Sequence, residues 1–434
     1  MSTGRARTRE DPMRAPIRAA ALVAAVALIA ACSPPDQASP EPYVPPRGVT
    51  ETEIRLGTHQ PLTGPAASYS RVSVAMKAYF DHVNAHGGVH GRQIVFLIKD
   101  DGYNPATTQT VVRELVEQDE VFAIVGGLGT PTHSAVLDYL KEEQVPDLFV
   151  ASGAGSWNQP ARYPGTFGFQ TDYTTEGKIV GHYLKEETVG ETVCAFHQDD
   201  DFGREFVAGV EVGLGTPVAL RQSYIPTNTN VAPQVQALQS AGCTVVVLAT
   251  LPSFTAQVLR TADQLSFRPH FVASTAGSDY ATVGAILGVD KALLEGLIST
   301  GYLPIATNPD DPWIALFQRI LDEYGDGGEV DNNVVVGMSI AYLTVQVLQR
   351  VGREITVDGL IAAIEEGGFR GPGLVPFAFS PTSHAGYSGG RMSKVINGKQ
   401  DYFGPAYVTD AGLAPVTEYT EPAAVPPPDG IPTP

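Results

Sequence analysis

Cysteine and basic side chains are the scarce components of this chain of 434 residues, which has 3 cysteines and 28 lysines and arginines against 47 acidic residues. Three cysteines are too few for a disulfide-built scaffold or a cysteine-based zinc module. A formal net charge of −19 disfavours nucleic acid as a partner, because the chain would repel phosphate groups. Hydrophobic residues form 43% of the sequence, which is enough for a packed core and excludes general disorder. The length favours two domains.

The N-terminal segment has the pattern of an export signal. Arginines precede the apolar run 19–31, which is short for a membrane span and typical of a signal peptide. The run ends in Ile29, two alanines and Cys32, an arrangement that resembles the bacterial lipobox. There, small side chains flank the cleaved bond and the cysteine thiol accepts diacylglycerol. The sequence therefore predicts a signal peptide over 1–31 and lipid attachment at Cys32.

A polar, proline-rich stretch follows the cysteine and cannot pack, so residues 32–50 are interpreted as a tether. Acyl chains would then hold an extracytoplasmic protein on the outer face of the cytoplasmic membrane. The alternative is an alanine-rich helix that ends in cysteine by chance. The acidic residues near the start leave open whether translation begins at Met1 or Met13.

The body of the chain alternates strands with helices in two successive runs, the second starting near residue 171. The expected strands are 54–58, 94–99, 122–125, 148–150, 192–197, 218–224, 243–249 and 270–274. Such alternation predicts parallel sheets that are covered by helices on both faces. Two runs predict two doubly wound α/β lobes, with the functional loops at the carboxyl ends of the strands.

The C-terminal part differs from this alternation. Helices are expected over 312–324, 333–351 and 356–366, followed by β-structure with Asn397-Gly398 as a hairpin turn. The proline-rich end, 413–434, is predicted to be disordered.

Several motifs in the same order resemble the Leu/Ile/Val-binding family of periplasmic binding proteins, of fold type I, which are receptors for ABC importers. The motifs are GTHQPLTGPAASYS, DHVNAHGGVHGRQIVFLIKDDGYNPATT, FAIVGGLGTPTHSAV, VPDLFVASGAG, FHQDDDFGREF, VVVLATLPSFTAQVLR and EGLISTGYL. The resemblance covers residues 54–407. It implies two lobes joined by three crossing strands, a ligand buried between the lobes, and a monomer.

The resemblance also gives expected domain boundaries. The crossings are placed near 170–172, 298–300 and 379–381. The first lobe is then 51–171 plus 300–380, and the second lobe is 172–299 plus 381–412.

Two glycine-rich turns suggest an anion pocket in the first lobe. Thr130 follows a strand at the start of a helix, where free amides favour a carboxylate, and Gly129 allows a close backbone approach. The candidate residues on this side are Tyr69, Leu128, Gly129, Thr130, Ser152, Gly153 and Ala154, with Tyr69 matching a contact tyrosine of the family. The alternative is that both turns are ordinary and that their threonine and serine only cap helices.

The second lobe supplies Phe202, Leu251, Thr275 and Asp279 as candidates. Amino-acid binders of the family usually carry an acidic residue after the fourth strand of this lobe, to pair with the ligand ammonium, and Thr275 stands there instead. A buried ammonium without a partner is costly. Either Asp279 reaches into the site, or the ligand lacks an α-ammonium.

Other signals are weaker. His82, His86 and His90 have metal-ligand spacing, but glycines interrupt the helix, and solvated histidines are expected. Cys194 and Cys243 are expected as buried free thiols, because they lie at different levels of their strands. Neither a metal nor a cofactor is predicted.

The sequence thus predicts a solute receptor and not an enzyme, since no nucleophile–base pair stands out. It would capture a branched-chain amino acid, or a related amide, oxo acid or aromatic acid, and deliver it to an ABC permease and its ATPase. The alternative is a ligand-sensing component of a signalling system.

Overall fold

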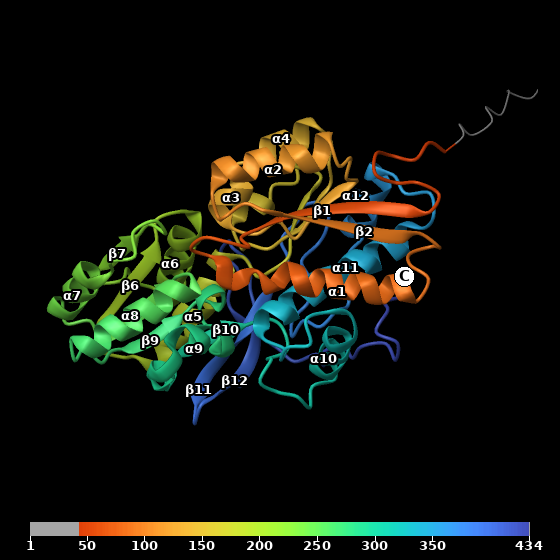
Figure 1. Ribbon diagram of the computed structural model, residues 1–434. Coiled ribbons are helices and arrows are strands. Elements are labelled where there is room, and N and C mark those ends of the chain that lie inside the picture. Colours follow the sequence, from red (N-terminus) through yellow and green to blue (C-terminus); the bar gives the residue numbers. More distant parts are fainter. Residues whose placement is uncertain (1–42, 434) are drawn as a thin grey trace, which may run out of the picture. The chain divides into compact units, whose positions relative to one another are not determined.

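The computed structural model describes residues 43–433, so the predicted signal peptide, Cys32 and part of the tether lie outside the described residues. One lobe is built on a parallel sheet in the order β2-β1-β3-β4-β5 (Figure 1). Its strands are β1 (Glu53–Gln60), β2 (Gln93–Asp100), β3 (Ala123–Val125), β4 (Asp147–Val150) and β5 (Thr166–Gly168). Its helices are η1 (Ala67–Tyr69), α1 (Arg71–Ala85), α2 (Pro105–Glu117), α3 (Thr130–Ser134), α4 (Leu137–Glu142), η2 (Gly155–Trp157), α10 (Pro312–Tyr324), α11 (Asn332–Val351) and α12 (Val357–Glu365).

Helix α11 is the central helix of this first lobe and packs along α1. It is the one helix among residues 43–433 that is long and apolar enough to cross a membrane. However, 78% of its most apolar stretch is buried inside the protein, so it serves as a core helix.

The second lobe is built on an eight-stranded sheet in the order β13-β12-β11-β10-β9-β8-β6-β7. Its strands are β6 (Val193–Gln198), β7 (Arg221–Tyr224), β8 (Val245–Ala249), β9 (His270–Ala273), β10 (Ile298–Gly301), β11 (Gly389–Ile396), β12 (Lys399–Val408) and β13 (Thr417–Tyr419). Its helices are α5 (Tyr173–Glu187), α6 (Asp201–Leu214), α7 (Ala232–Ser240), α8 (Pro252–Gln264), η3 (Thr275–Gly277), α9 (Tyr280–Leu287) and η4 (Gly288–Leu294). Strands β6 to β10 are parallel, which confirms the predicted two-lobed α/β fold.

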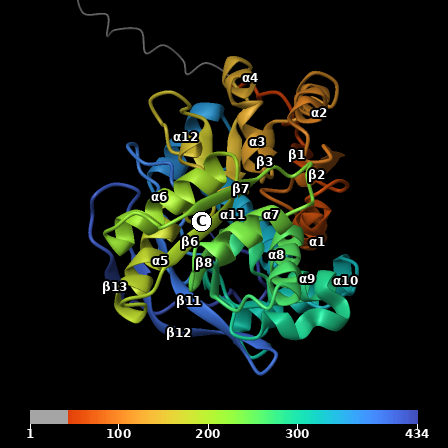
Figure 2. The ribbon, with the colours of Figure 1, turned by 90° about the vertical axis from the view of Figure 1, so that its left-hand side faces the viewer.

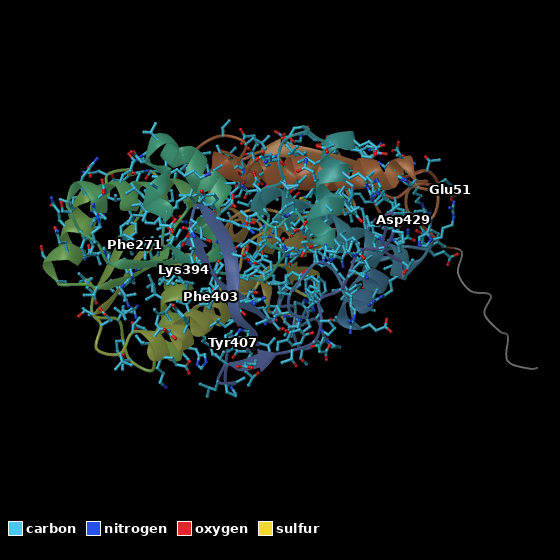
Figure 3. The ribbon with its side chains drawn as sticks, turned by 90° about the horizontal axis from the view of Figure 1, so that it is seen from below. Glu51, Phe271, Lys394, Phe403, Tyr407 and Asp429 are labelled. Atoms are coloured by element: carbon cyan, nitrogen blue, oxygen red, sulfur yellow. A yellow bond between two sulfur atoms is a disulfide. The ribbon has the colours of Figure 1, made fainter. Side chains whose placement is uncertain are left out.

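The last three strands of this sheet are antiparallel. The predicted turn at Asn397-Gly398 closes the β11–β12 hairpin, and both residues have positive φ, as a tight hairpin requires. On β12, the Phe403 and Tyr407 rings lie 5.7 and 5.5 Å from the rings of Tyr183 and His182 on α5 (Figure 3). The hairpin therefore covers one side of α5.

The third connection between the lobes lies later than expected. The Gly168 amide donates to the carbonyl of His384 and the Tyr387 amide to that of Phe169, so 384–387 still belongs beside β5. Strand β11 enters the second sheet only at Gly389. Aromatic packing keeps the segment before this connection on the first lobe, because the Phe379 ring lies against Phe167.

The proline-rich end is ordered over the described residues 413–433, which corrects the expectation of disorder there. Three buried side chains donate to its carbonyls: Tyr79 to Gly430 (2.5 Å), His82 to Asp429 (2.8 Å) and Trp313 to Ala424 (2.7 Å). A segment without regular structure keeps its backbone acceptors free, so donors on α1 and α10 can bind it.

The contact with Asp429 corrects the expectation of solvated histidines for His82 only, since His86 is exposed as expected. His82 is 5% exposed, and the His86 ring hydrogen-bonds to the His82 carbonyl at 2.8 Å. Within residues 43–433, no group of three or more potential ligands is placed to hold a metal ion.

Cys194 and Cys243 form a disulfide with a Cα–Cα distance of 5.9 Å, so the expectation of two free thiols is wrong. Cys194 lies on β6 and pairs in register with Val246 of β8. Cys243 does not continue β8 in a straight line; its amide donates to Leu238, so it lies in the turn after α7. That turn brings Cys243 level with Cys194, which strand positions alone did not show.

Candidate functional site: a cavity between the lobes

A cavity of about 90 Å³ lies between the lobes and is lined by residues of both. This volume holds a few water molecules or a small solute. The lining residues are Tyr69, Val72, Tyr103, Leu128, Gly129, Thr130, Ala151, Gln170, Tyr173, Phe202, Leu251, Pro252, Thr275, Ala276, Asp279, Thr282, Tyr302, Asn332, Asn333 and Val336.

Eight of the predicted site residues are brought together in this lining: Tyr69, Leu128, Gly129, Thr130, Phe202, Leu251, Thr275 and Asp279. They meet because they follow strands, or begin helices, at the edges where the two sheets face each other. The remaining three, Ser152, Gly153 and Ala154, lie behind the wall. Ala151 reaches the cavity instead, and the Gly153 carbonyl accepts from the Tyr173 amide at 2.8 Å.

Three hydroxyl groups gather where the first lobe meets α5. Thr130 Oγ1 and Ser152 Oγ are 2.7 Å apart, and Ser152 Oγ lies 3.4 Å from the Tyr173 hydroxyl. Burial raises the pKa of Tyr173 to about 12, so this phenol stays protonated as a possible donor. Gly129 has φ +103°, and a Cβ there would lie 2.5 Å from Thr132 Oγ1. The loop therefore needs glycine where it approaches the cavity.

Asp279 is the only acidic residue in the lining, which contains no lysine, arginine or histidine. It caps the N-terminus of α9, where its Oδ2 accepts from the Thr282 amide at 2.8 Å and from the Thr282 hydroxyl. Burial raises the pKa of Asp279, while the bonds from Thr282 oppose the rise. The structure thus supplies a carboxylate at the cavity from the helix cap and not from position 275.

Thr275 is held by other groups. Its amide donates to Glu176 Oε1 at 2.6 Å, and its hydroxyl lies 2.9 Å from Thr300 Oγ1. Glu176 also accepts from Thr300 Oγ1, and burial raises its pKa. The acid beside Thr275 therefore comes from α5, behind the wall.

The lobes touch directly across the cleft. Tyr69 donates its hydroxyl hydrogen to the Ala276 carbonyl at 2.7 Å, and Asn333 Nδ2 donates to Thr282 Oγ1 at 3.1 Å. Farther out, the Gly155 amide donates to Glu205 Oε2 at 2.9 Å. These bonds join the first lobe to the second, so the cleft is closed.

Closure is expected to strengthen several-fold as the pH falls from about 8 to about 5. Burial, with the nearby charges of Asp201 and Asp172, raises the pKa of Glu205 to about 7. Opening would expose Glu205 and return its pKa toward about 4.3. The closed form then binds the proton more tightly, so this contribution grows below about pH 7 and is lost above it.

Small-angle scattering across this pH range would measure closure as a smaller radius of gyration. Glu205→Gln should remove the Glu205 part of the pH dependence. Glu211→Gln, on the same helix, is the matched control. A wild-type pH dependence identical to that of Glu205→Gln would contradict the prediction.

Sequence reasoning missed twelve lining residues, among them the polar side chains of Tyr103, Gln170, Tyr173, Tyr302, Asn332 and Asn333. Three of them carried a signal: Tyr103 follows β2, whereas Tyr173 and Tyr302 directly follow connections between the lobes. Asn332 and Asn333 had none, because they reach the cavity only through the placement of α11.

Two α/β lobes that enclose a cavity and touch across it define a two-lobed binding protein. A family model described as Periplasmic binding protein matches residues 53–400, and the chain belongs to this family. The family expected from the motifs is thereby confirmed.

Relatives and solved structures agree with this assignment. The chain is 22% identical over 268 residues to "Leu/Ile/Val-binding protein homolog 7" of Brucella melitensis biotype 1; the match covers 59% of this chain and 66% of the relative, slightly less than two thirds. A valine-bound branched-chain amino acid ABC transporter protein from Thermus thermophilus has a TM-score of 0.73 at 20% identity, covering 84% of this chain and 98% of its own. A fatty acid ABC transporter substrate-binding protein from Thermomonospora curvata has a TM-score of 0.75 at 21% identity, covering 88% and 99%. At these identities the structural likeness concerns the fold.

Proposed function

We propose that this protein is an extracytoplasmic solute-binding lipoprotein that captures a small carboxylate-bearing solute between its lobes and delivers it to an ABC permease. The observation that carries the proposal is the lining of the cavity. The Thr130 hydroxyl lies on the first-lobe side next to Ser152, and the Asp279 carboxylate lies on the second-lobe side with the hydroxyls of Thr275 and Thr282. The names of its relatives, which include an "Amino acid binding protein" of Pseudomonas aeruginosa, support the same solute class.

The placement of Asp279 favours a solute with an α-ammonium group. Thr130 and the Gly129 backbone would hold the solute carboxylate, and Asp279 would pair with the ammonium. Phe202 and Leu251 would contact an apolar side chain. A 2-oxo acid would place a second acceptor near Asp279 and leave this buried carboxylate without a cationic partner, at a cost.

The cavity supports binding without catalysis. Among its lining residues, all of which the structure describes, no hydroxyl or thiol lies beside an imidazole or an amine base. Export is supported by the Cys194–Cys243 disulfide, since such bonds persist in oxidising compartments. Lipid attachment at Cys32 is part of the proposal and rests on the sequence motif.

A thermal-shift screen tests the function. The panel contains leucine, isoleucine and valine, their 2-oxo acids, short amides and aromatic carboxylates. A solute at 100 times its Kd stabilises the folded protein by about 2.7 kcal/mol, which raises the unfolding midpoint visibly. We expect the branched-chain amino acids to raise it. No shift with any carboxylate would overturn the proposed solute class.

Asp279→Asn is expected to weaken amino-acid binding roughly hundredfold, because a buried ammonium would lose its charged partner. The same change should leave the affinity for the matching 2-oxo acid unchanged or improve it. Titration calorimetry with leucine and its 2-oxo acid measures both. Asp263→Asn, at an exposed carboxylate of the same lobe, is the control. Equal losses for both solutes would contradict the pairing with ammonium and indicate a structural role only.

A further inference from the structure

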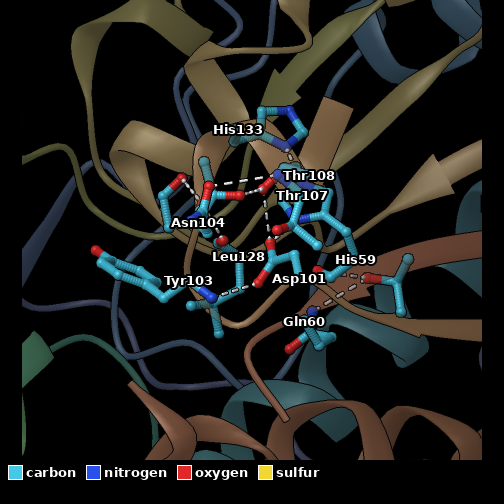
Figure 4. A network of polar contacts seen from close by, with 12 residues as sticks. His59, Gln60, Asp101, Tyr103, Asn104, Thr107, Thr108, Leu128 and His133 are labelled. Atoms are coloured by element: carbon cyan, nitrogen blue, oxygen red, sulfur yellow. Dashed lines mark hydrogen bonds and ion pairs between the residues drawn. The ribbon is translucent and has the colours of Figure 1, made fainter. Parts of the chain in front are cut away.

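A chain of four buried polar side chains runs through the first lobe, and Figure 4 labels three of them, Asp101, His59 and His133. Asp101 Oδ2 lies 2.8 Å from His59 Nδ1, His59 Nε2 lies 2.9 Å from His133 Nδ1, and His133 Nε2 lies 2.8 Å from Asp147 Oδ2. The side chains come from β1, the loop after β2, α3 and β4, and each is at most 1% exposed. We call these four residues the buried relay.

The distances fix the number of protons in the buried relay. Each of its three contacts needs one hydrogen, and an ionised carboxylate only accepts. His59 Nδ1 and His133 Nε2 therefore carry one hydrogen each, and the contact between the rings requires a third. With only two protons in the buried relay, the lone pairs of His59 Nε2 and His133 Nδ1 would face each other at 2.9 Å. With four protons, both of these atoms would carry a hydrogen, and the two N–H groups would face each other.

With both carboxylates ionised, the third proton makes one of the two rings an imidazolium. Burial lowers the pKa of His59, while its hydrogen bond to Asp101 opposes this. Two uncharged groups also face the buried relay. Thr108 of α2 donates to Asp101, and the Trp157 ring lies edge-on to His133 at 5.0 Å.

The buried relay supports two of the loops that line the cavity. Asp101 Oδ1 accepts from the amide of Tyr103 at 2.8 Å, and Tyr103 is a lining residue. The His133 amide donates to the Gly129 carbonyl at 3.0 Å. A Cβ on Gly127 would lie 2.5 Å from His133 Nδ1 and 2.6 Å from His59 Nε2, so the loop passes directly over the contact between the rings.

We propose that His59 and His133 are positioning residues of the binding site, and that the proton they share holds loop 127–130 in the geometry that binds solute. Loss of this proton at higher pH puts two lone pairs under Gly127 and displaces the loop. Gain of a fourth proton at low pH has the same effect. Solute affinity is therefore highest at intermediate pH. The proposal rests on the proposed function of the cavity.

Nuclear magnetic resonance on the protein with ¹⁵N-labelled histidine tests the proton count without any solute. At neutral pH, we expect one of the two rings to be doubly protonated and the other to be neutral. The exposed His270 serves as the internal reference. Two neutral rings, or two imidazolium rings, would overturn the proposal.

Asp147→Asn keeps an acceptor for His133 Nε2 but removes the negative charge beside the His133 ring. The shared proton should then leave at a lower pH. Leucine is the probe, and its affinity is measured by calorimetry in the Glu205→Gln background. This affinity should fall about tenfold over the pH range in which the variant loses the shared proton. Asp138→Asn, at an exposed carboxylate of the same lobe, should change neither profile.

The two readouts separate the proposals. If leucine does not bind but the resonances show the shared proton, the solute assignment fails and the proton count stands. If leucine binds and its affinity does not change when the shared proton is lost, the positioning role of His59 and His133 is contradicted. The receptor function stands in that case.

Discussion

Replacing both Cys194 and Cys243 by alanine is expected to lower the free energy of unfolding by about 4 kcal/mol. The bond joins residues 49 positions apart, so it restricts the unfolded chain strongly. Both residues are buried, and they tie β6 to the turn that precedes the neighbouring strand β8. Urea unfolding of the wild type and the double variant measures the difference.

Reduction supplies the control for this prediction. A reductant should shift the urea midpoint of the wild type toward that of the double variant and leave the double variant unchanged. Equal stability of the oxidised wild type and the double variant would show that the disulfide does not stabilise the protein.

Gly181→Ala should destabilise the protein by about 3 kcal/mol, because it forces apart two helices whose backbones touch. A Cβ at Gly181 would lie 2.1 Å from the Val210 carbonyl oxygen, and one at Gly177 would lie 2.2 Å from that of Phe206. These close approaches join α5 to α6, which lie side by side in Figure 2. No rotamer change relieves a clash with backbone, so one helix must move.

The same substitution should weaken solute binding. Tyr173 begins α5 and Phe202 lies in the first turn of α6, so a shift between these helices moves two lining residues apart. Gly165→Ala is the matched control, since a Cβ there meets no heavy atom within 3.8 Å and should change stability by about 0.5 kcal/mol or less. Denaturant unfolding and leucine calorimetry measure both effects. A Gly181→Ala variant as stable as Gly165→Ala would contradict the close packing.

Much of the site could be predicted because it follows a rule about strand ends. Leu128–Thr130 and Leu251 follow parallel strands, and they line the cavity as expected. The same rule predicts Ser152 in the lining, whereas its neighbour Ala151 lies there. The chain turns away directly after Ala151, where the Gly153 carbonyl accepts from the Tyr173 amide. The sequence left open whether Asp279 reaches the site or the ligand lacks an α-ammonium. Only the position of Asp279 as the cap of α9 shows that it lines the cavity.

By itself, the sequence determined the features that depend on neighbours along the chain. These are the alternation of strands and helices, the glycine turn at Gly129, the hairpin at Asn397-Gly398 and the motifs of the family. Backbone geometry and hydrophobic periodicity act over a few residues, so a single sequence shows them.

Only the tertiary structure decided the features that depend on which distant segments meet. It paired Cys194 with Cys243, docked the proline-rich end on α1 and α10, and brought His59 within 2.9 Å of His133. Each of these contacts joins residues that are far apart in the chain. Their formation depends on the packing of whole helices and sheets, because that packing sets which donors, acceptors and thiols come within bonding distance.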